Sequence, residues 1–208
     1  MLEGERIGIM YLWQRDFSRS FIDKYISLLI DAYKSIDASS RKEVLLEEQR
    51  RKELVEKMRD LKSNYQIMFP ISYEVGEGTK RMDIVCYLDY LSEEYYICFE
   101  CKRFIQKGII PSYFRNEYYS EGIKRYEDAE YSSKMNCAGM AAFLESGSYE
   151  KLMSLFKGQL PLFSVNQPVE ENRSFLGQDY CVFRSLHHRV NELEDIEISH
   201  VLLNLTCD

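Results

Sequence analysis

The stretch that decides the fold runs from Arg81 to Lys102. Its first part, residues 81–88, reads RMDIVCYL, and its last part, residues 95–102, reads YYICFECK. Both parts are rich in β-branched and aromatic residues, and the segment between them, DYLSEE at 89–94, suits a chain reversal. The pattern therefore predicts a β-hairpin, and the other elements are placed around it.

The hairpin brings charged residues together. A turn centred between Leu91 and Ser92 places Asp83 opposite Glu100, and opposed residues share a face with Cα atoms about 4.5–5.5 Å apart. Side chains alternate along a strand, so Lys102 points the same way as Glu100. Two buried carboxylates repel each other unless a proton, a cation or a metal neutralises them. Because the ammonium of Lys102 offsets one negative charge, the other calls for a divalent metal.

A strand is predicted before the hairpin, at 67–75, where apolar and polar residues alternate. The glycine-rich segment 76–79 then turns the chain back. This turn pairs Glu74 with Arg81 and places it on the face of Asp83, whereas a slip of one residue would place it on the other face. Glu74 is therefore a candidate third carboxylate.

The rest of the chain predicts an α/β architecture. Apolar residues recur at helical spacing in four segments, namely 20–35, from a cap at 37–40 to about 63, 116–132 and 149–156. Three further segments read as strands: 136–144, which is apolar throughout, and 179–186 and 196–205 at the C-terminal end. No repeat or linker divides the chain, so one domain over residues 1–208 is expected.

Composition limits the function classes. The chain has 208 residues, 45% of them apolar, which is enough for one good core. The net charge of −7 gives no global positive field, so a nucleic-acid surface has to be local. No apolar run reaches the roughly 20 residues that span a bilayer, and the N-terminus lacks the order of a signal peptide. We expect a cytoplasmic protein without a membrane partner.

Three local patterns allow alternatives. Cys98 and Cys101 have CxxC spacing, but residues three apart on a strand point to opposite faces, so we expect buried thiols rather than a zinc site. The wholly polar segment 47–53 is expected to be a solvated helix face, although Arg50, Arg51 or Lys52 could instead contact a phosphate backbone. The histidines, His187, His188 and His200, are expected to make ordinary hydrogen bonds rather than bind a metal.

The order of these elements resembles the PD-(D/E)XK nuclease superfamily, which has the restriction-endonuclease-like fold. A helix, a three-strand meander carrying Asp and then Glu-x-Lys, a second helix and a buried strand cover about residues 40–145. The signature residues are Asp83, Glu100 and Lys102, while Met82 stands where the motif has proline. The resemblance implies a central mixed sheet flanked by helices, to which this chain adds N-terminal helices and two C-terminal strands.

The resemblance also implies metal-dependent hydrolysis of phosphodiester bonds, with DNA favoured over RNA. Asp83, Glu100 and the backbone carbonyl of Cys101 would hold Mg²⁺ or Mn²⁺, which prefer oxygen ligands. Lys102 would orient the attacking water and offset charge on phosphorus. Arg103 and Lys124 are further candidates for contacts with nucleic acid.

Other readings of the same residues stay open. Asp83 and Glu100 could be solvated, or salt-bridged to Lys102, at a sheet edge. The nuclease fold could also serve as a catalytically silent module that binds nucleic acid or protein, and a homo-oligomer is compatible with the sequence.

Overall fold

The computed structural model describes residues 3–36, 47–76, 81–88, 95–171, 180–190 and 193–206, with side chains from residue 19 in the first helix and from residue 48 in the second. The cap expected at 37–40, the turn expected at 89–94 and, except for Gly76, the turn expected at 76–79 lie outside the described residues.

The core of the fold is a seven-stranded mixed β-sheet in the order β1-β2-β3-β4-β7-β6-β5. The meander β1–β2–β3 is antiparallel, β3, β4 and β7 run parallel to one another, and β6 and β5 add antiparallel strands. The strands are β1 (Ile71–Val75), β2 (Met82–Tyr87), β3 (Tyr96–Phe104), β4 (Cys137–Leu144), β5 (Val169–Glu171), β6 (Tyr180–His187) and β7 (Ile196–Asn204). The expected mixed sheet flanked by helices is confirmed at this level.

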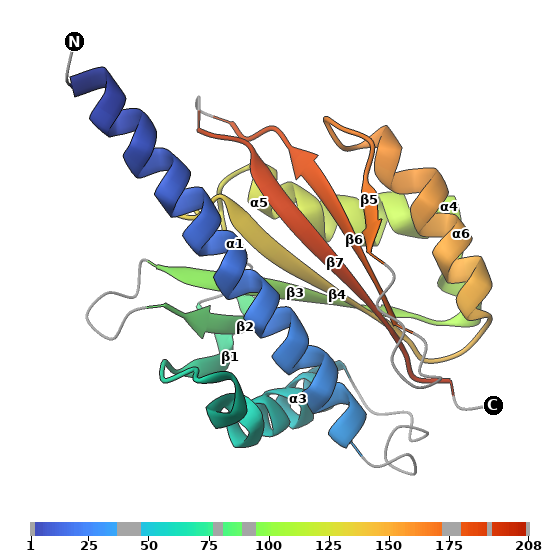
Figure 1. Ribbon diagram of the computed structural model, residues 1–208. Helices are drawn as coiled ribbons and strands as arrows, with labels where there is room; N and C mark the ends of the chain where they lie inside the picture. The colour runs from blue at the N-terminus through green and yellow to red at the C-terminus, as the bar shows by residue number, and fades with distance from the viewer. Residues whose placement is uncertain are drawn as a thin grey trace.

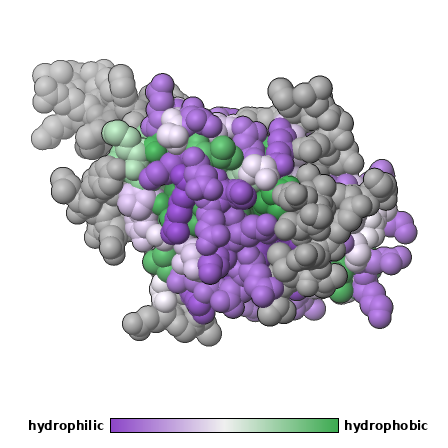
Figure 2. Space-filling model, turned by 90° about the horizontal axis from the view of Figure 1, so that it is seen from below, coloured by the Kyte–Doolittle hydropathy of each residue, from purple (hydrophilic) through white to green (hydrophobic). Residues whose placement is uncertain are grey.

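Two helices cover one face of the sheet. Helix α1 (Glu3–Ser35, blue) crosses it diagonally, and α3 (Glu47–Leu61) lies beside the meander (Figure 1). The core side of α1 has the predicted spacing, with Tyr25, Leu29 and Ala32 fully buried. The opposite side of α3 is polar, and the surface seen from below is largely hydrophilic (Figure 2). The short 3-10 helix η1 (Lys62–Tyr65) ends α3 before the chain enters β1.

A second helical layer covers the other face of the sheet (Figure 1). A continuous helical segment comprises α4 (Pro111–Tyr113), the π-helix η4 (Phe114–Ile123) and α5 (Lys124–Glu127). It connects β3 to β4. Helix α6 (Tyr149–Gln159) follows β4, and short 3-10 helices are present at η3 (Gln106–Gly108) and η5 (Leu160–Leu162).

The π-helix corrects the helix predicted over 116–132. The helix begins earlier, at Pro111, and ends at Glu127. Ile123 and Tyr126 of the predicted core stripe are fully buried, but at its N-terminal end Tyr118 is buried in place of the predicted Tyr119. A π-helix has hydrogen bonds from i to i+5, so its wider turns shift the buried face away from the position that regular α-helical spacing indicates.

The strands expected from the sequence agree with the structure in most places. The strand expected over 67–75 begins only at Ile71, after Pro70, and β5 lies in a segment where no strand was predicted. Strand β4 is buried along its whole length, as its apolar sequence predicts. Cys98 packs in the core under the α5 layer and Cys101 in the core under α1 and α3, so the two sulfurs lie on opposite faces. Within the described residues, none of the helices combines the length and apolarity that crossing a bilayer requires.

Candidate active site

Three carboxylates lie level with one another across β1, β2 and β3. Ile84 pairs with Phe99, and this register places Asp83 opposite Glu100, as the sequence predicted. Tyr73 and Val75 pair with Ile84 and Met82, so Glu74 lies level with Asp83 rather than with Arg81. The pairing predicted for Glu74 is wrong by two residues, and because strand faces alternate with period 2, the predicted face is kept.

Glu100 is buried deepest of the three carboxylates, with 3% of its surface exposed. Its Oε1 lies 3.2 Å from Nζ of Lys102 and 3.8 Å from Nη1 of Arg125. Its Oε2 is buried and has no hydrogen-bond partner. Burial, followed by repulsion from Asp83, raises the pKa of Glu100 to about 7, although Lys102 and Arg125 oppose the shift.

Asp83 sits where β2 and β3 begin to separate. Its Oδ2 accepts a hydrogen bond from the N–H of Cys101 at 2.7 Å, and its Oδ1 lies 3.0 Å from Nη1 of Arg51. Burial raises the pKa of Asp83, and Arg51 is the strongest of the groups that oppose this. The carboxylate therefore takes the place of a backbone acceptor and ties β2 to β3 beside Glu100.

Glu74 has a left-handed backbone conformation with φ of +54°. This region is unfavourable for a residue with a Cβ, at a cost on the order of 1 kcal/mol, and such strain is common at functional sites. Oε1 of Glu74 lies 2.9 Å from Nη2 of Arg51, and Oε2 accepts a hydrogen bond from Arg81. Two arginines thus hold this side chain beside Asp83.

Arg51 is a site residue that the sequence analysis placed elsewhere. The polar segment 47–53 was expected to be solvated, which is correct for the exposed Lys52 and wrong for its neighbours. Arg50 is 1% exposed and pairs with Glu53, and Arg51 is ion-paired to Glu74 and Asp83. Residues this polar are buried only where opposite charges face them, and the facing carboxylates come from distant strands. In the sequence, the one indication of a site role for Arg51 was the alternative that it contacts a phosphate backbone.

Arg125 is the second cation that sequence reasoning missed. Its guanidinium donates a hydrogen bond to the hydroxyl of Tyr131, which in turn donates to the carbonyl of Arg81 at 2.8 Å. These contacts hold Arg125 beside Glu100. Sequence reasoning had selected the neighbouring Lys124, whose ammonium instead lies 3.1 Å from Asp128. The other candidate, Arg103, donates from Nε to Glu145 at 2.8 Å. Neither residue is therefore paired with the carboxylate row, which is the set Glu74, Asp83 and Glu100.

Lys102 is held close to the π-helix. A Cβ built on Gly122 would lie 2.6 Å from Cε of Met140 and 3.5 Å from Cε of Lys102. The absence of a side chain at Gly122 therefore lets η4 pass close to both residues. Tyr126 fixes the next turn, since its hydroxyl accepts from the N–H of Glu100 at 3.1 Å and donates to the carbonyl of Gly139 at 2.9 Å.

His187 and His200 belong to a separate buried chain of hydrogen bonds, and the exposed His188 lies 2.6 Å from Asp195, so all three make the hydrogen bonds expected of them. Nδ1 of His200 lies 3.0 Å from the hydroxyl of Tyr118, and its Nε2 lies 2.6 Å from Oγ of Ser185. Nε2 of His187 lies 2.7 Å from the same Oγ, and its Nδ1 lies 3.0 Å from Glu127. Burial, followed by repulsion from His187, holds the pKa of His200 well below its ordinary value.

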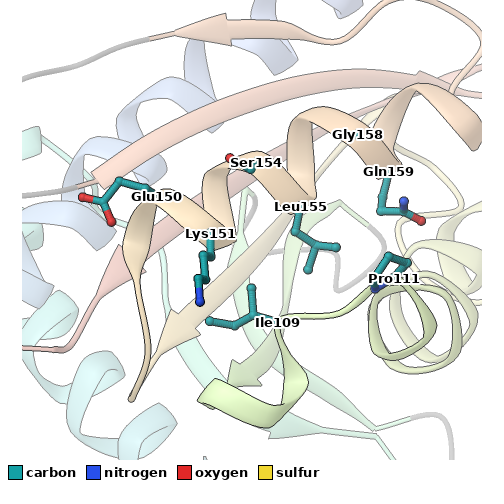
Figure 3. Close-up of a pocket in the computed structure, with 8 residues that line it drawn as sticks. All are labelled: Ile109, Pro111, Glu150, Lys151, Ser154, Leu155, Gly158 and Gln159. Atoms are coloured by element: carbon teal, nitrogen blue, oxygen red, sulfur yellow. The ribbon is translucent and has the colours of Figure 1, made fainter.

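Two hollows on the described surface lie away from the row formed by Glu74, Asp83 and Glu100. One of about 440 Å³ opens between α6 and the segment before α4, lined among others by Ile109, Pro111, Lys151 and Leu155 (Figure 3). No residue of the carboxylate row lines it. In the part of the chain that the structure describes, no group of three or more His, Cys, Asp or Glu side chains is arranged as a ready metal-binding cluster.

Comparisons with known proteins assign no family to this chain. No family model matches the chain, and neither the curated proteins nor the solved structures include a match.

Proposed function

We propose that this protein is a metal-dependent nuclease of the PD-(D/E)XK type, which hydrolyses phosphodiester bonds. The observation that carries the proposal is the level placement of Glu74, Asp83 and Glu100, with Lys102 beside Glu100. The antiparallel meander, the helical crossover and the parallel strand β4 support it, because the resemblance implies this order of elements.

The donor set fits a hard divalent cation. Mg²⁺ and Mn²⁺ are bound through carboxylate and carbonyl oxygens together with water. Oε2 of Glu100 is a buried oxygen without a hydrogen-bond donor, which is costly unless a cation or a proton reaches it. We assign Asp83, Glu100 and the carbonyl of Cys101 as ligands, with Glu74 as a third carboxylate. When bound, the ion would polarise a phosphate oxygen and lower the pKa of a bound water.

The protein's own groups then position the reaction. Lys102 would hold the attacking water and stabilise negative charge that develops on the phosphate, because its ammonium is kept at the end of the carboxylate row. Arg125, fixed by Tyr131, would place a second positive charge on the same side. DNA is the favoured substrate, in a reducing compartment such as the cytoplasm, where the buried thiols would persist.

A second candidate function is a catalytically silent module that binds nucleic acid or protein. The observation that favours it is the balance of charge at the site. Arg51 is paired to Glu74 and Asp83, and Lys102 and Arg125 are paired to Glu100, so the carboxylates are compensated by side chains alone.

The experiment that separates the two candidates compares the wild type with Asp83→Asn. Nicking of plasmid DNA and degradation of single-stranded DNA and RNA are followed with Mg²⁺, with Mn²⁺ and with EDTA. The nuclease predicts metal-dependent cleavage by the wild type and none by Asp83→Asn. Both metal ions should raise the melting temperature of the wild type more than that of Asp83→Asn.

Glu145→Gln is the matched carboxylate control, because Glu145 is ion-paired to Arg103 and does not belong to the carboxylate row. This variant should keep the activity. Metal binding without cleavage of any of the three substrates would favour the silent module. A wild type that neither binds metal nor cleaves would rule out the nuclease.

A further inference from the structure

Arg51 bridges two of the three carboxylates. Its Nη1 lies 3.0 Å from Oδ1 of Asp83, and its Nη2 lies 2.9 Å from Oε1 of Glu74. All three side chains are largely buried, with 14% of Arg51, 12% of Asp83 and 10% of Glu74 exposed. Charge-assisted pairs of this kind are strong, and breaking one leaves a buried charge without compensation.

The bridge conflicts with metal binding at the same oxygens. Mg²⁺ requires ligand oxygens at about 2.0–2.1 Å in nearly octahedral geometry. Oδ2 of Asp83 is already bonded to the N–H of Cys101, and Oδ1 faces the guanidinium. A divalent ion that takes Oδ1 would place two positive charges next to Arg51, so the arginine has to leave.

The side chain of Arg51 can leave without moving its helix. Leu54, Val55 and Met58 of α3 are fully buried in the core under the sheet. The neighbouring Arg50 is also buried and is held by Glu53 at 3.0 Å. The backbone of α3 is therefore anchored, and rotation about the side-chain bonds of Arg51 is enough to break the bridge.

A displaced Arg51 needs a new anionic partner. The other carboxylate of the row, Glu100, is already compensated by Lys102 and Arg125. A phosphate group bound at the metal would supply the missing negative charge, and guanidinium groups bind phosphate oxygens with two parallel hydrogen bonds.

We propose that Arg51 is an exchangeable counterion, which pairs with Asp83 and Glu74 in the metal-free protein and moves to the substrate phosphate when metal binds. The proposal rests on the metal-dependent function proposed above. It predicts that the metal and a phosphate ligand bind cooperatively, because each relieves the cost that the other imposes on Arg51. By linkage, the metal should strengthen phosphate binding by the same factor.

The test measures Mn²⁺ affinity by calorimetry, with and without thymidine 5′-monophosphate, which has no phosphodiester bond to cleave. In the wild type, the nucleotide should tighten Mn²⁺ binding at least about fivefold. Arg51→Gln should bind Mn²⁺ about tenfold or more tightly than the wild type when no nucleotide is present, because a nearby positive charge is gone. The same variant should show clearly weaker cooperativity than the wild type and melt at a lower temperature in EDTA.

Arg184→Gln is the matched control, because Arg184 also forms ion pairs, with Asp23 and Glu171, outside the row. It should lower the melting temperature and leave both Mn²⁺ affinity and cooperativity unchanged. If Arg51→Gln does not fold, Arg51→Lys replaces it: a single ammonium cannot bridge two carboxylates equally well, so Mn²⁺ affinity should rise by a smaller factor and the cooperativity should fall.

The outcomes separate this proposal from the proposed function. Mn²⁺ binding that is equal or weaker in Arg51→Gln than in the wild type would overturn the counterion role and leave the metal site standing. Cooperativity that is as strong in Arg51→Gln as in the wild type would do the same. Absence of Mn²⁺ binding in both proteins would remove the metal site and the counterion role together.

Discussion

Oε1 of Glu100 lies 3.2 Å from Nζ of Lys102, two residues further along the same strand. Strand alternation alone places these two groups on one face of the sheet. The two oxygens of Glu100, however, have different surroundings. Oε1 faces the cationic groups of Lys102 and Arg125, whereas Oε2 of the same carboxylate is buried and has no hydrogen-bond donor. This asymmetry leaves one oxygen without a hydrogen-bond partner, while the other anchors the lysine.

Lys102→Ala should abolish metal-dependent cleavage and spare metal binding. An ammonium cannot be a metal ligand and repels the ion, so Mn²⁺ affinity should stay equal or rise slightly, whereas Asp83→Ala should lose both affinity and activity. A role in orienting water or in stabilising charge predicts a rate loss on the order of 10² or more. Single-turnover cleavage of DNA and calorimetry measure the two effects, and Lys151→Ala on the exposed side of α6 is the control. Activity that persists in Lys102→Ala would point to a contaminating nuclease or to a different catalytic group.

Glu100→Gln should change how stability depends on pH in the metal-free protein. The folded-state pKa of Glu100 is raised to about 7, so the folded state binds its proton more tightly than the unfolded chain does. The stabilising contribution of Glu100 is therefore complete below the unfolded pKa near 4.5 and is lost as pH rises through 7. Glu100→Gln should lack this loss and gain on the order of 2 kcal/mol relative to the wild type between pH 4.5 and pH 8.

Urea unfolding in EDTA at a series of pH values measures the difference. Glu56→Gln, on the exposed side of α3, should follow the wild type. Parallel profiles for Glu100→Gln and the wild type would show that the carboxyl group is not desolvated in the folded state.

Ser185→Ala should destabilise the fold, because it removes a hydrogen-bond partner from a nitrogen on each of two buried histidine rings. The hydroxyl of Ser185 lies between Nε2 of His187 and Nε2 of His200, and all three residues are buried. Removing the hydroxyl leaves ring nitrogens without a partner, which costs about 1–3 kcal/mol. Chemical denaturation measures the loss, and Ser154→Ala, exposed on α6, should change stability by less than about 0.5 kcal/mol. Equal values for the two variants would mean that a water replaces the hydroxyl.

Gly122→Ala should reduce both stability and activity, because its Cβ would come within 2.6 Å of Cε of Met140. The end of the Met140 side chain would have to move within the core, where Met140 is fully buried and pairs with Glu100 on the adjacent strand. Gly158→Ala is the matched helical control, since nothing lies within 4 Å of its Cβ. That substitution should raise stability by about 0.5–1 kcal/mol, because alanine loses less backbone entropy than glycine. Thermal melts and cleavage rates of both variants test the comparison.

The sequence by itself determined the part of the site that depends on strand geometry. The period of 2 and a turn centred between Leu91 and Ser92 are enough to place Asp83 opposite Glu100, and the observed register agrees. The same alternation separates Cys98 from Cys101. It also kept Glu74 on the correct face although its partner was misplaced, because a shift of two residues preserves the face.

Only the tertiary structure decided which cations compensate these carboxylates. Arg51 comes from a helix whose polar segment looks solvated in sequence, and its burial depends on charges more than 20 residues away that only folding brings together. Arg125, rather than Lys124, reaches Glu100 because the preceding turns form a π-helix, which rotates the helix face by an amount that hydrophobic spacing does not encode. Local period determines what one strand presents, whereas the partner of a buried charge is determined by the packing of whole elements against one another.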